Sequence, residues 1–139
     1  MNEARIKELL EQAIMNLFEH QKNIFDFTSQ TSQTEWNLGH HYANEVHKFF
    51  TDYDCDLDVV KTNFHNRRPD IIFHNRGYND RNILVIEIKF DETEEVVAEE
   101  IQRIRDNWFH PPLSYDFGAV VNLKSNKTGD VIPITNSHT

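Results

Sequence analysis

The chain has 139 residues, 38% of them apolar, with a mean hydropathy of −0.66 and a formal net charge of −9. This profile indicates one globular domain with a core of its own, and no stretch approaches the ~18 apolar residues of a membrane helix. The first residues lack the basic-then-apolar layout of a secretion signal. Cys55 is the single cysteine, which excludes an internal disulfide and indicates a reducing, cytoplasmic environment. No His/Cys pattern has the spacing of a structural zinc site.

The negative charge argues against a protein that coats nucleic acid non-specifically, because polyanion binding relies on Lys and Arg. The charge is unevenly distributed along the chain. Residues 61–81 contain five Lys or Arg and two Asp, whereas residues 91–100 contain six carboxylates and no base. We therefore expect one locally positive side on an otherwise acidic molecule.

Residues 3–22 are predicted to form an amphipathic helix, because their apolar residues recur at a spacing of three and four. These residues are Ile6, Leu9, Leu10, Ala13, Ile14, Leu17 and Phe18. The polar tract at residues 28–34 breaks this pattern and is predicted to be a loop.

A second helix is predicted from about residue 35 to residue 50, with Ser32 or Thr34 as its N-cap. Its inner stripe consists of Leu38, Tyr42, Val46 and Phe49. Glu35 falls on the same stripe and Glu45 lies near its edge.

Strand-like segments follow the two helices. Residues 55–64 alternate in part, with Leu57 and Val59 on one face. A strand over residues 69–73, a turn-rich segment and a long apolar strand over residues 83–90 then predict a hairpin.

A third helix is predicted over residues 93–108, where Pro111 and Pro112 stop it. Its apolar side consists of Val96, Val97, Ile101, Ile104 and Trp108. A buried strand over residues 117–123 follows, and then a short edge strand whose Pro133 cannot donate to a ladder. The order predicts an α/β fold in which a mixed sheet of four to five strands is flanked by helices, with 83–90 and 117–123 parallel.

The apolar strand carries two charged residues, Glu87 and Lys89. Because side chains alternate along a strand, both share a face with Ile83 and Val85. The opposite face is apolar as well, so the strand is expected to be central and covered on both sides. An ionised pair in such a place costs several kcal/mol unless it is well paired or binds an ion.

The hairpin register explains these charges. If its turn is centred on Tyr78-Asn79, Asp70 lies opposite Glu87, so Asp70, Glu87 and Lys89 converge. Adjacent carboxylates repel, and one of them binds a proton unless a cation lies between them. Mg²⁺ is the natural cation, and Lys89 then holds a water or a phosphate oxygen. A register that separates the two carboxylates would make the pattern a coincidence.

Pro69-Asp70, sixteen intervening residues and Glu87-Ile88-Lys89 resemble the signature of the PD-(D/E)xK nuclease superfamily, whose fold is restriction-endonuclease-like. The resemblance covers residues 34–123 and includes the αβββαβ order of elements. It implies a single domain over residues 1–139, in which residues 3–22 are an N-terminal helical extension that packs on the domain or supports a dimer.

The resemblance implies metal-dependent hydrolysis of phosphodiester bonds, by in-line attack of a water activated by Mg²⁺ or Mn²⁺. Asp70 resembles the metal-bridging carboxylate, and Glu87 resembles the second metal ligand. The main-chain carbonyl of Ile88 is expected to be a further ligand. Lys89 resembles the residue that orients or activates the water.

Other positions fit the family pattern less closely. Glu35 matches the helix carboxylate of many members, with Glu45 as the alternative. Gln102, and then Arg105, is the candidate for a polar residue that reaches the site from the following helix. Arg67 and Arg68 precede the motif and are candidates for contacting substrate phosphate.

The sequence thus predicts a metal-dependent nuclease whose partner is nucleic acid, with DNA favoured over RNA and a homodimer left open. The alternative is a catalytically silent nuclease-fold module, an accessory subunit of a mobile-element or defence system. Such a module would contact its partner through the N-terminal helix or the acidic face. The complete set Asp70, Glu87 and Lys89 favours the enzyme, and the net charge of −9 favours the module.

Overall fold

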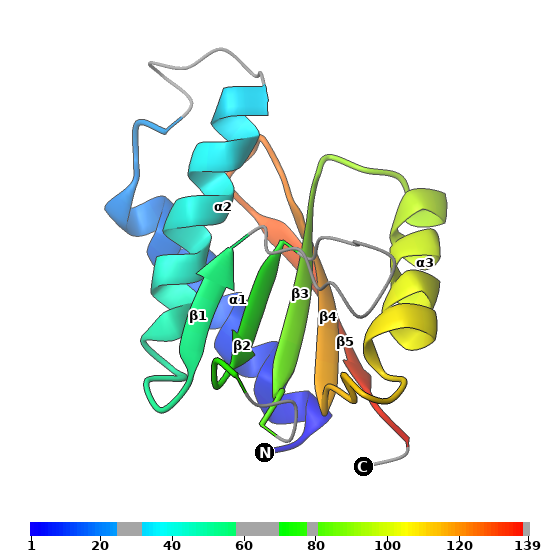
Figure 1. Cartoon of the computed structure of the whole chain (residues 1–139). Helices are drawn as coiled ribbons and strands as arrows, with labels where there is room; N and C mark the ends of the chain where they lie inside the picture. Colours follow the sequence, from blue (N-terminus) through cyan, green and yellow to red (C-terminus); the bar gives the residue numbers. More distant parts are fainter. Residues whose placement is uncertain (25–31, 58–69, 78–80, 138–139) are drawn as a thin grey trace.

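The computed structural model describes residues 1–24, 32–57, 70–77 and 81–137, with the side chains of residues 32–36 outside this description. Its elements in chain order are α1 (Glu3–His20), α2 (Ser32–His47), β1 (Asp54–Leu57), β2 (Ile71–His74), β3 (Leu84–Phe90), α3 (Glu94–Arg103), a π-helical turn (Ile104–Trp108), β4 (Phe117–Leu123) and β5 (Gly129–Thr135) (Figure 1). The predicted α/β class and order of elements are confirmed.

The five strands lie in the sheet in the order of the chain, β1-β2-β3-β4-β5. The β3–β4 pair is parallel, as predicted, and α3 makes the crossover between these strands. The other neighbouring pairs are antiparallel. The sheet is therefore mixed, and β3 lies at its centre.

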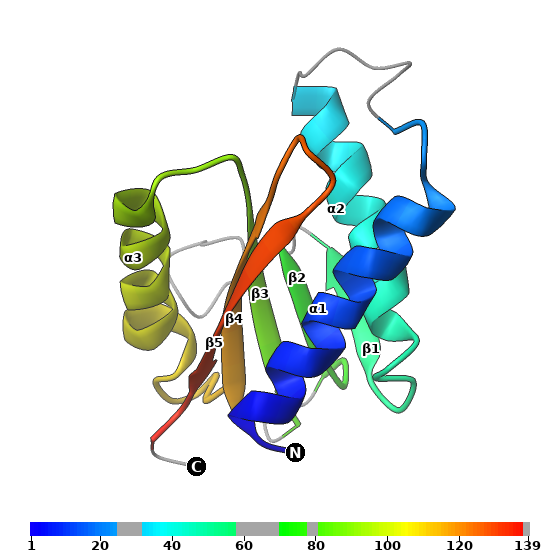
Figure 2. The ribbon, with the colours of Figure 1, turned by 180° about the vertical axis from the view of Figure 1, so that it is seen from behind.

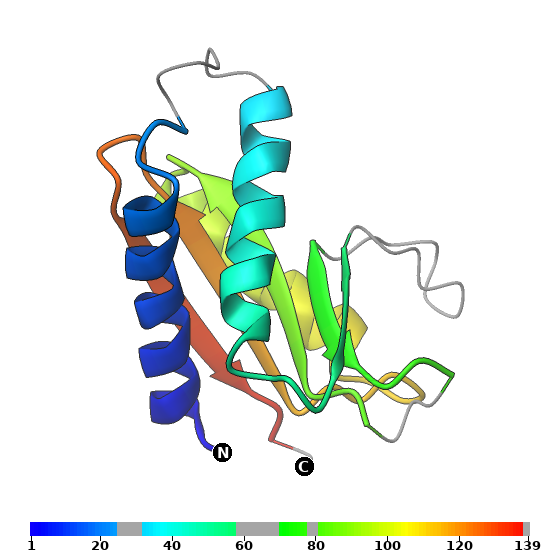
Figure 3. The same cartoon turned by 90° about the vertical axis from the view of Figure 1, so that its left-hand side faces the viewer.

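Helices cover both faces of this sheet. α1 and α2 share one apolar core with alternate residues of the strands, among them Ile71, Ile86 and Val121. The opposite face packs against α3 and the segment after it, through residues such as Val85 and Val120. Figures 2 and 3 show α1 and α3 on opposite sides of the sheet. The prediction that β3 is buried on both faces is confirmed over Leu84–Ile86.

The N-terminal helix belongs to the core of the domain. All seven residues predicted for its inner face are buried in α1. The Asn2 side chain caps the helix by accepting from the main-chain N–H of Arg5 at 2.9 Å. The Tyr42 hydroxyl of α2 donates to the carbonyl of Leu10 at 3.0 Å. Of the two expected roles of this helix, the structure shows packing on the domain.

The end of α2 differs from the prediction. Leu38, Tyr42 and Val46 are buried as expected, but Phe49 is half-buried and Phe50 is buried instead. The α-helix ends at His47, and a turn follows in which the N–H of Phe50 bonds to the carbonyl of His47. The helical phase is lost there, which brings Phe50 into the core.

The third helix also departs from a continuous α-helix. It changes after Arg103 into a π-helical turn that keeps Ile104, Asn107 and Trp108 buried. A π-turn contains more residues than an α-turn and therefore rotates the residues that follow it. Gly118 of β4 permits this close packing, because a Cβ atom there would lie 2.6 Å from Cγ2 of Ile104. None of the helices in the described ranges is both long and apolar enough to cross a bilayer.

Candidate active site

The β2–β3 hairpin has the register expected from the sequence. Ile71 pairs with Ile86 and Ile72 pairs with Val85. Asp70 directly precedes β2, so it lies next to Glu87 on the face that α3 covers. The predicted turn centre at residues 78–79 lies outside the described residues. The register itself is confirmed by the paired strands, and it does not separate the two carboxylates.

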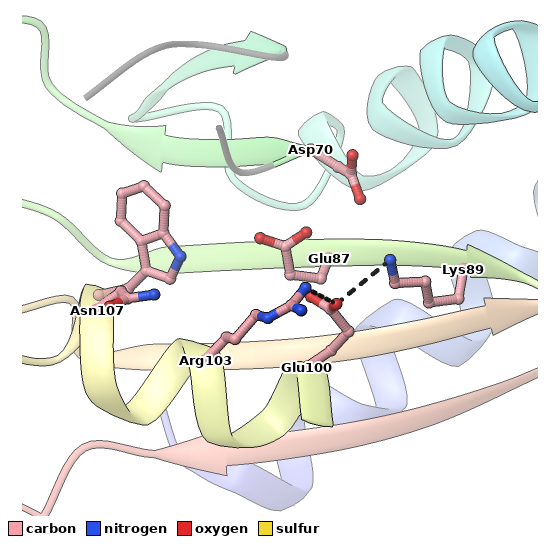
Figure 4. Close-up of a pocket in the computed structure, with 7 residues that line it drawn as sticks. Asp70, Glu87, Lys89, Glu100, Arg103 and Asn107 are labelled. Atoms are coloured by element: carbon pink, nitrogen blue, oxygen red, sulfur yellow. Dashed lines mark hydrogen bonds and ion pairs between the residues drawn. The ribbon is translucent and has the colours of Figure 1, made fainter. Parts of the chain in front are cut away.

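These carboxylates open into a cleft between the sheet and α3, with a volume of about 380 Å³. The residues that line the cleft are Asp70, Glu87, Lys89, Glu100, Arg103, Asn107 and Trp108. Figure 4 shows Asp70, which directly precedes β2, together with Glu87 of β3 and Glu100 of α3, directed toward the same space. The cleft therefore combines the three motif residues with charged side chains of the crossover helix.

Asp70 is fixed by the main chain of the neighbouring strand. The N–H of Ile88 donates to Oδ2 of Asp70 at 2.5 Å. Burial raises the pKa of Asp70, while the hydrogen bond from Ile88 opposes this shift. The sequence predicts that Ile88 contributes its main-chain carbonyl to the site. The contact that Ile88 makes there in the structure is a hydrogen bond from its N–H to Asp70.

Glu87 is 9% exposed, and its pKa lies well above the ordinary value of 4.5. Burial is the largest cause, followed by the negative charges of Asp70 and Glu100. In the metal-free protein Glu87 therefore holds a proton at neutral pH. This is the behaviour expected of two adjacent carboxyl groups without a cation.

Lys89 and Arg103 converge on a third carboxylate, Glu100. Arg103 Nη1 lies 2.6 Å from Oε1 of Glu100, and Lys89 Nζ lies 3.5 Å from the same oxygen (Figure 4). The Glu100 side chain is 7% exposed, whereas those of Lys89 and Arg103 are 28% and 57% exposed. Glu100 thus holds two solvent-accessible cations at the rim of the cleft.

Glu100 and Arg103 were not predicted as site residues. The residues predicted to reach the site from this helix are Gln102 and then Arg105, and both are exposed. Gln102 donates to the side chain of Asp106 at 2.8 Å. Glu100 points into the cleft because of the helical phase: it lies three residues after the buried Val97 and so shares its face of the helix. That spacing was the available signal in the sequence.

The remaining candidates lie elsewhere. Glu45 is buried, but it pairs with His20 at 2.8 Å and Lys48 at 3.0 Å and does not line the cleft. Glu35 belongs to α2, and its side chain is outside the described part of the chain. Arg67 and Arg68 also lie outside the described residues.

The donor atoms of the cleft fit a hard cation such as Mg²⁺ in part. Asp70 and Glu87 offer oxygen ligands, and both carboxyl groups have a raised pKa that a cation would reverse. Within the described ranges, however, no three His, Cys, Asp or Glu residues are grouped so as to hold a metal. A two-carboxylate site suits Mg²⁺, which keeps several waters and binds substrate phosphates.

Comparison with known proteins identifies no relative of this chain. No protein-family model, no curated protein and no solved structure matches the chain. The chemistry of the cleft therefore has to be inferred from its own residues.

Proposed function

We propose that this protein is a metal-dependent nuclease of the PD-(D/E)xK type, an endonuclease or other phosphodiesterase. The observation that carries the proposal is the convergence of Asp70, Glu87 and Lys89 in one cleft on adjacent strands. The order of helices and strands around the cleft supports the same proposal.

Asp70 and Glu87, with the main-chain carbonyl of Ile88, would hold Mg²⁺ or Mn²⁺. The bound metal would lower the pKa of a water and neutralise charge on the phosphoryl oxygens. Lys89 lies on the same strand face as Glu87 and would orient the water or a phosphate oxygen. Glu35, on α2, remains our candidate for a further carboxylate.

Glu100 and Arg103 add a second part to this mechanism. Their ion pair holds Arg103 beside the cleft, where a half-exposed guanidinium can reach a phosphate of the substrate. Glu100 also pairs with Lys89 and limits the positions of its ammonium group. We propose Glu100 as a positioning residue and Arg103 as a phosphate contact.

The charges of the cleft support a requirement for metal. Asp70, Glu87 and Glu100 outnumber Lys89 and Arg103 by three to two. With Glu87 protonated, as in the metal-free protein, the charges of these five groups sum to zero, and ionisation of Glu87 would bring the sum to −1, so in neither state would the cleft attract a phosphate. A divalent cation would change this sum to +1, so the metal would also be needed to admit the substrate.

We favour DNA over RNA as the substrate. We also propose a cytoplasmic location and leave open that the protein forms a homodimer. Arg67 and Arg68, which precede Asp70 in the chain, are further candidates for phosphate contacts. The second candidate function is a catalytically silent nuclease-fold module, favoured by the net charge of −9. A silent module would not need a cleft with two carboxyl groups and a lysine.

The first test is calorimetric titration of Mn²⁺ and Mg²⁺ into the wild type and the Asp70→Ala variant. We expect binding in the wild type and its loss in the variant. Cleavage of single- and double-stranded nucleic acids is then compared for wild type, Glu87→Ala and Lys89→Ala. Glu99→Ala and Lys7→Ala are matched controls, since both side chains are exposed outside the cleft.

The expected outcome is cleavage by the wild type and both controls and none by the cleft variants, with unchanged circular dichroism. Cleavage retained in both folded variants would overturn the mechanism. A wild type that binds metal but cleaves no nucleic acid would favour the silent module.

A further inference from the structure

A second hollow lies on the other side of α3, toward the sheet edge formed by β5. Its volume is about 430 Å³. Its apolar lining consists of Val97, Ala98, Ile101, Val120 and Ile132. The cleft is lined from β3 and this hollow from β4 and β5, so α3 separates the two. We call this hollow the β5 groove.

The floor of the β5 groove is open to solvent at Ile132. Ile134 lies on the same face of β5 and is 1% exposed, because it packs in one cluster with Phe109 and Leu113. Ile132 is 38% exposed. Part of an apolar strand face is therefore left uncovered at Ile132, in the same groove as the exposed Ala98 and the half-buried Ile101 of α3.

The rim of the β5 groove is acidic. Glu92, Glu94 and Asp130 lie on it together with one base, Lys124. Lys124 is paired with Asp130 at 3.6 Å, whereas no ion pair within the described ranges involves Glu92 or Glu94. The side chain of Asn122 fixes this rim through hydrogen bonds to the N–H and the carbonyl of Glu92, both at 3.0 Å.

We propose that the β5 groove docks a basic segment of a partner protein, in which apolar side chains are flanked by Lys or Arg. The apolar side chains would cover Ile132 and Ile101, and the cations would lie against Glu92 and Glu94. Charge complementarity selects this occupant. A nucleic acid is disfavoured by the acidic rim, and a second copy of the chain is disfavoured by its net charge of −9.

The proposal is independent of the nuclease function. The groove and the cleft share no lining residue, so an occupant of one leaves Asp70 and Glu87 accessible. A cationic partner would also reduce the net negative charge that opposes the approach of any polyanion. Docking and metal binding can therefore be tested separately.

The probe is a fluorescein-labelled peptide, Lys-Lys-Leu-Ile-Leu-Lys-Lys, titrated with the full chain and followed by fluorescence anisotropy. Two matched peptides replace either the Lys residues by Glu or the apolar block by Ser. We expect saturable binding of the first peptide alone. Tight binding of the Ser peptide would show attraction by net charge only and would overturn the proposal.

Two protein variants place the binding in the groove. Ile132→Ser removes the exposed apolar contact, and Met15→Ser is its control on α1, where Met15 is 65% exposed. Ala98→Lys puts a cation into the groove on an exposed helix position that tolerates Lys well. We expect Ile132→Ser and Ala98→Lys each to weaken binding about tenfold, a loss of ~1.4 kcal/mol, and Met15→Ser to leave it unchanged. Equal affinity in wild type and both groove variants would overturn the proposal.

Discussion

The main-chain N–H of Ile88 donates a hydrogen bond to the carboxylate of Asp70, with 2.5 Å between the nitrogen and Oδ2. The bond ties the start of β2 to β3 and holds Asp70 beside Glu87. It favours the charged form of Asp70, whereas Glu87 is more deeply buried and faces two negative charges. The proton of the metal-free pair therefore lies on Glu87.

The first prediction concerns Asp70. The Asp70→Asn variant keeps the shape of the side chain and removes its charge. We expect the variant to lose binding of Mn²⁺ in calorimetry, because one neutral and one negative ligand attract a divalent cation less than two carboxylates do. Asp52→Asn, a substitution at an exposed position, is the control. Unchanged Mn²⁺ affinity in Asp70→Asn would place the metal elsewhere.

The second prediction is a pH dependence of stability. The pKa of Glu87 in the folded, metal-free protein lies above its ordinary value of 4.5. Below pH 4.5 the carboxyl group of Glu87 is protonated in both the folded and the unfolded protein. As the pH rises, the unfolded chain releases the proton first, so the free energy of unfolding falls until the pH passes the raised pKa. The raised pKa of Asp70 acts in the same direction.

This pH dependence is measured by urea denaturation in EDTA at a series of pH values from about 5 upward. Glu87→Gln is expected to flatten the decline, and Glu99→Gln at an exposed position is expected to leave it unchanged. Saturating Mn²⁺ should remove much of the decline in the wild type. A Glu87→Gln profile parallel to that of the wild type would contradict the assigned cause.

The third prediction contrasts two buried carboxylates of one cleft. At pH 8 in EDTA, Glu87→Gln is expected to stabilise the protein by about 1–3 kcal/mol, because the raised pKa of Glu87 obliges the wild type to take up a proton on folding, and glutamine does not. Glu100→Gln is expected to destabilise it by about 1 kcal/mol, because Glu100 holds two cations that are themselves solvent-accessible. Chemical denaturation measures both. Stabilisation by Glu100→Gln would show that its ion pairs do not stabilise the fold, and destabilisation by Glu87→Gln would contradict the cost assigned to that carboxyl group.

The fourth prediction concerns Arg103 and uses its neighbour Arg105 as the control. Both side chains are exposed, but only Arg103 lines the cleft. We expect Arg103→Gln to weaken nucleic-acid binding in the presence of Ca²⁺ and to reduce the slope of log affinity against log salt by about 1, with Arg105→Gln unchanged. Calorimetric Mn²⁺ affinity should be the same in both. Equal salt slopes in the two variants would exclude Arg103 as a phosphate contact.

Much of the fold was predictable because its signals are local. The alternation of side chains along β3 predicts that Glu87 and Lys89 lie on the same face of the sheet. The register predicted for the hairpin places Asp70 next to Glu87, and the paired strands confirm that register. The parallel β3–β4 pair followed from the helix between these strands. These inferences needed only the period of a strand and one turn.

The parts that were missed depend on tertiary packing. The six carboxylates of residues 91–100 have the pattern of a solvated acidic helix start, which fits the exposed Glu94, Glu95 and Glu99 but not the buried Glu100. Its partners Lys89 and Arg103 show that a buried carboxylate is tolerated where cations converge on it. The π-turn after Arg103 has no comparable signal in a single sequence.

The close packing of Gly118 against Ile104 limits how this sequence can diverge. A relative that keeps the helix at this distance from β4 must keep glycine at position 118, or change both positions together to conserve the shared volume. This constraint comes from packing and not from catalysis. It would persist in descendants that had lost the charges of the cleft, so the buried pair is a marker of kinship that does not depend on those charges.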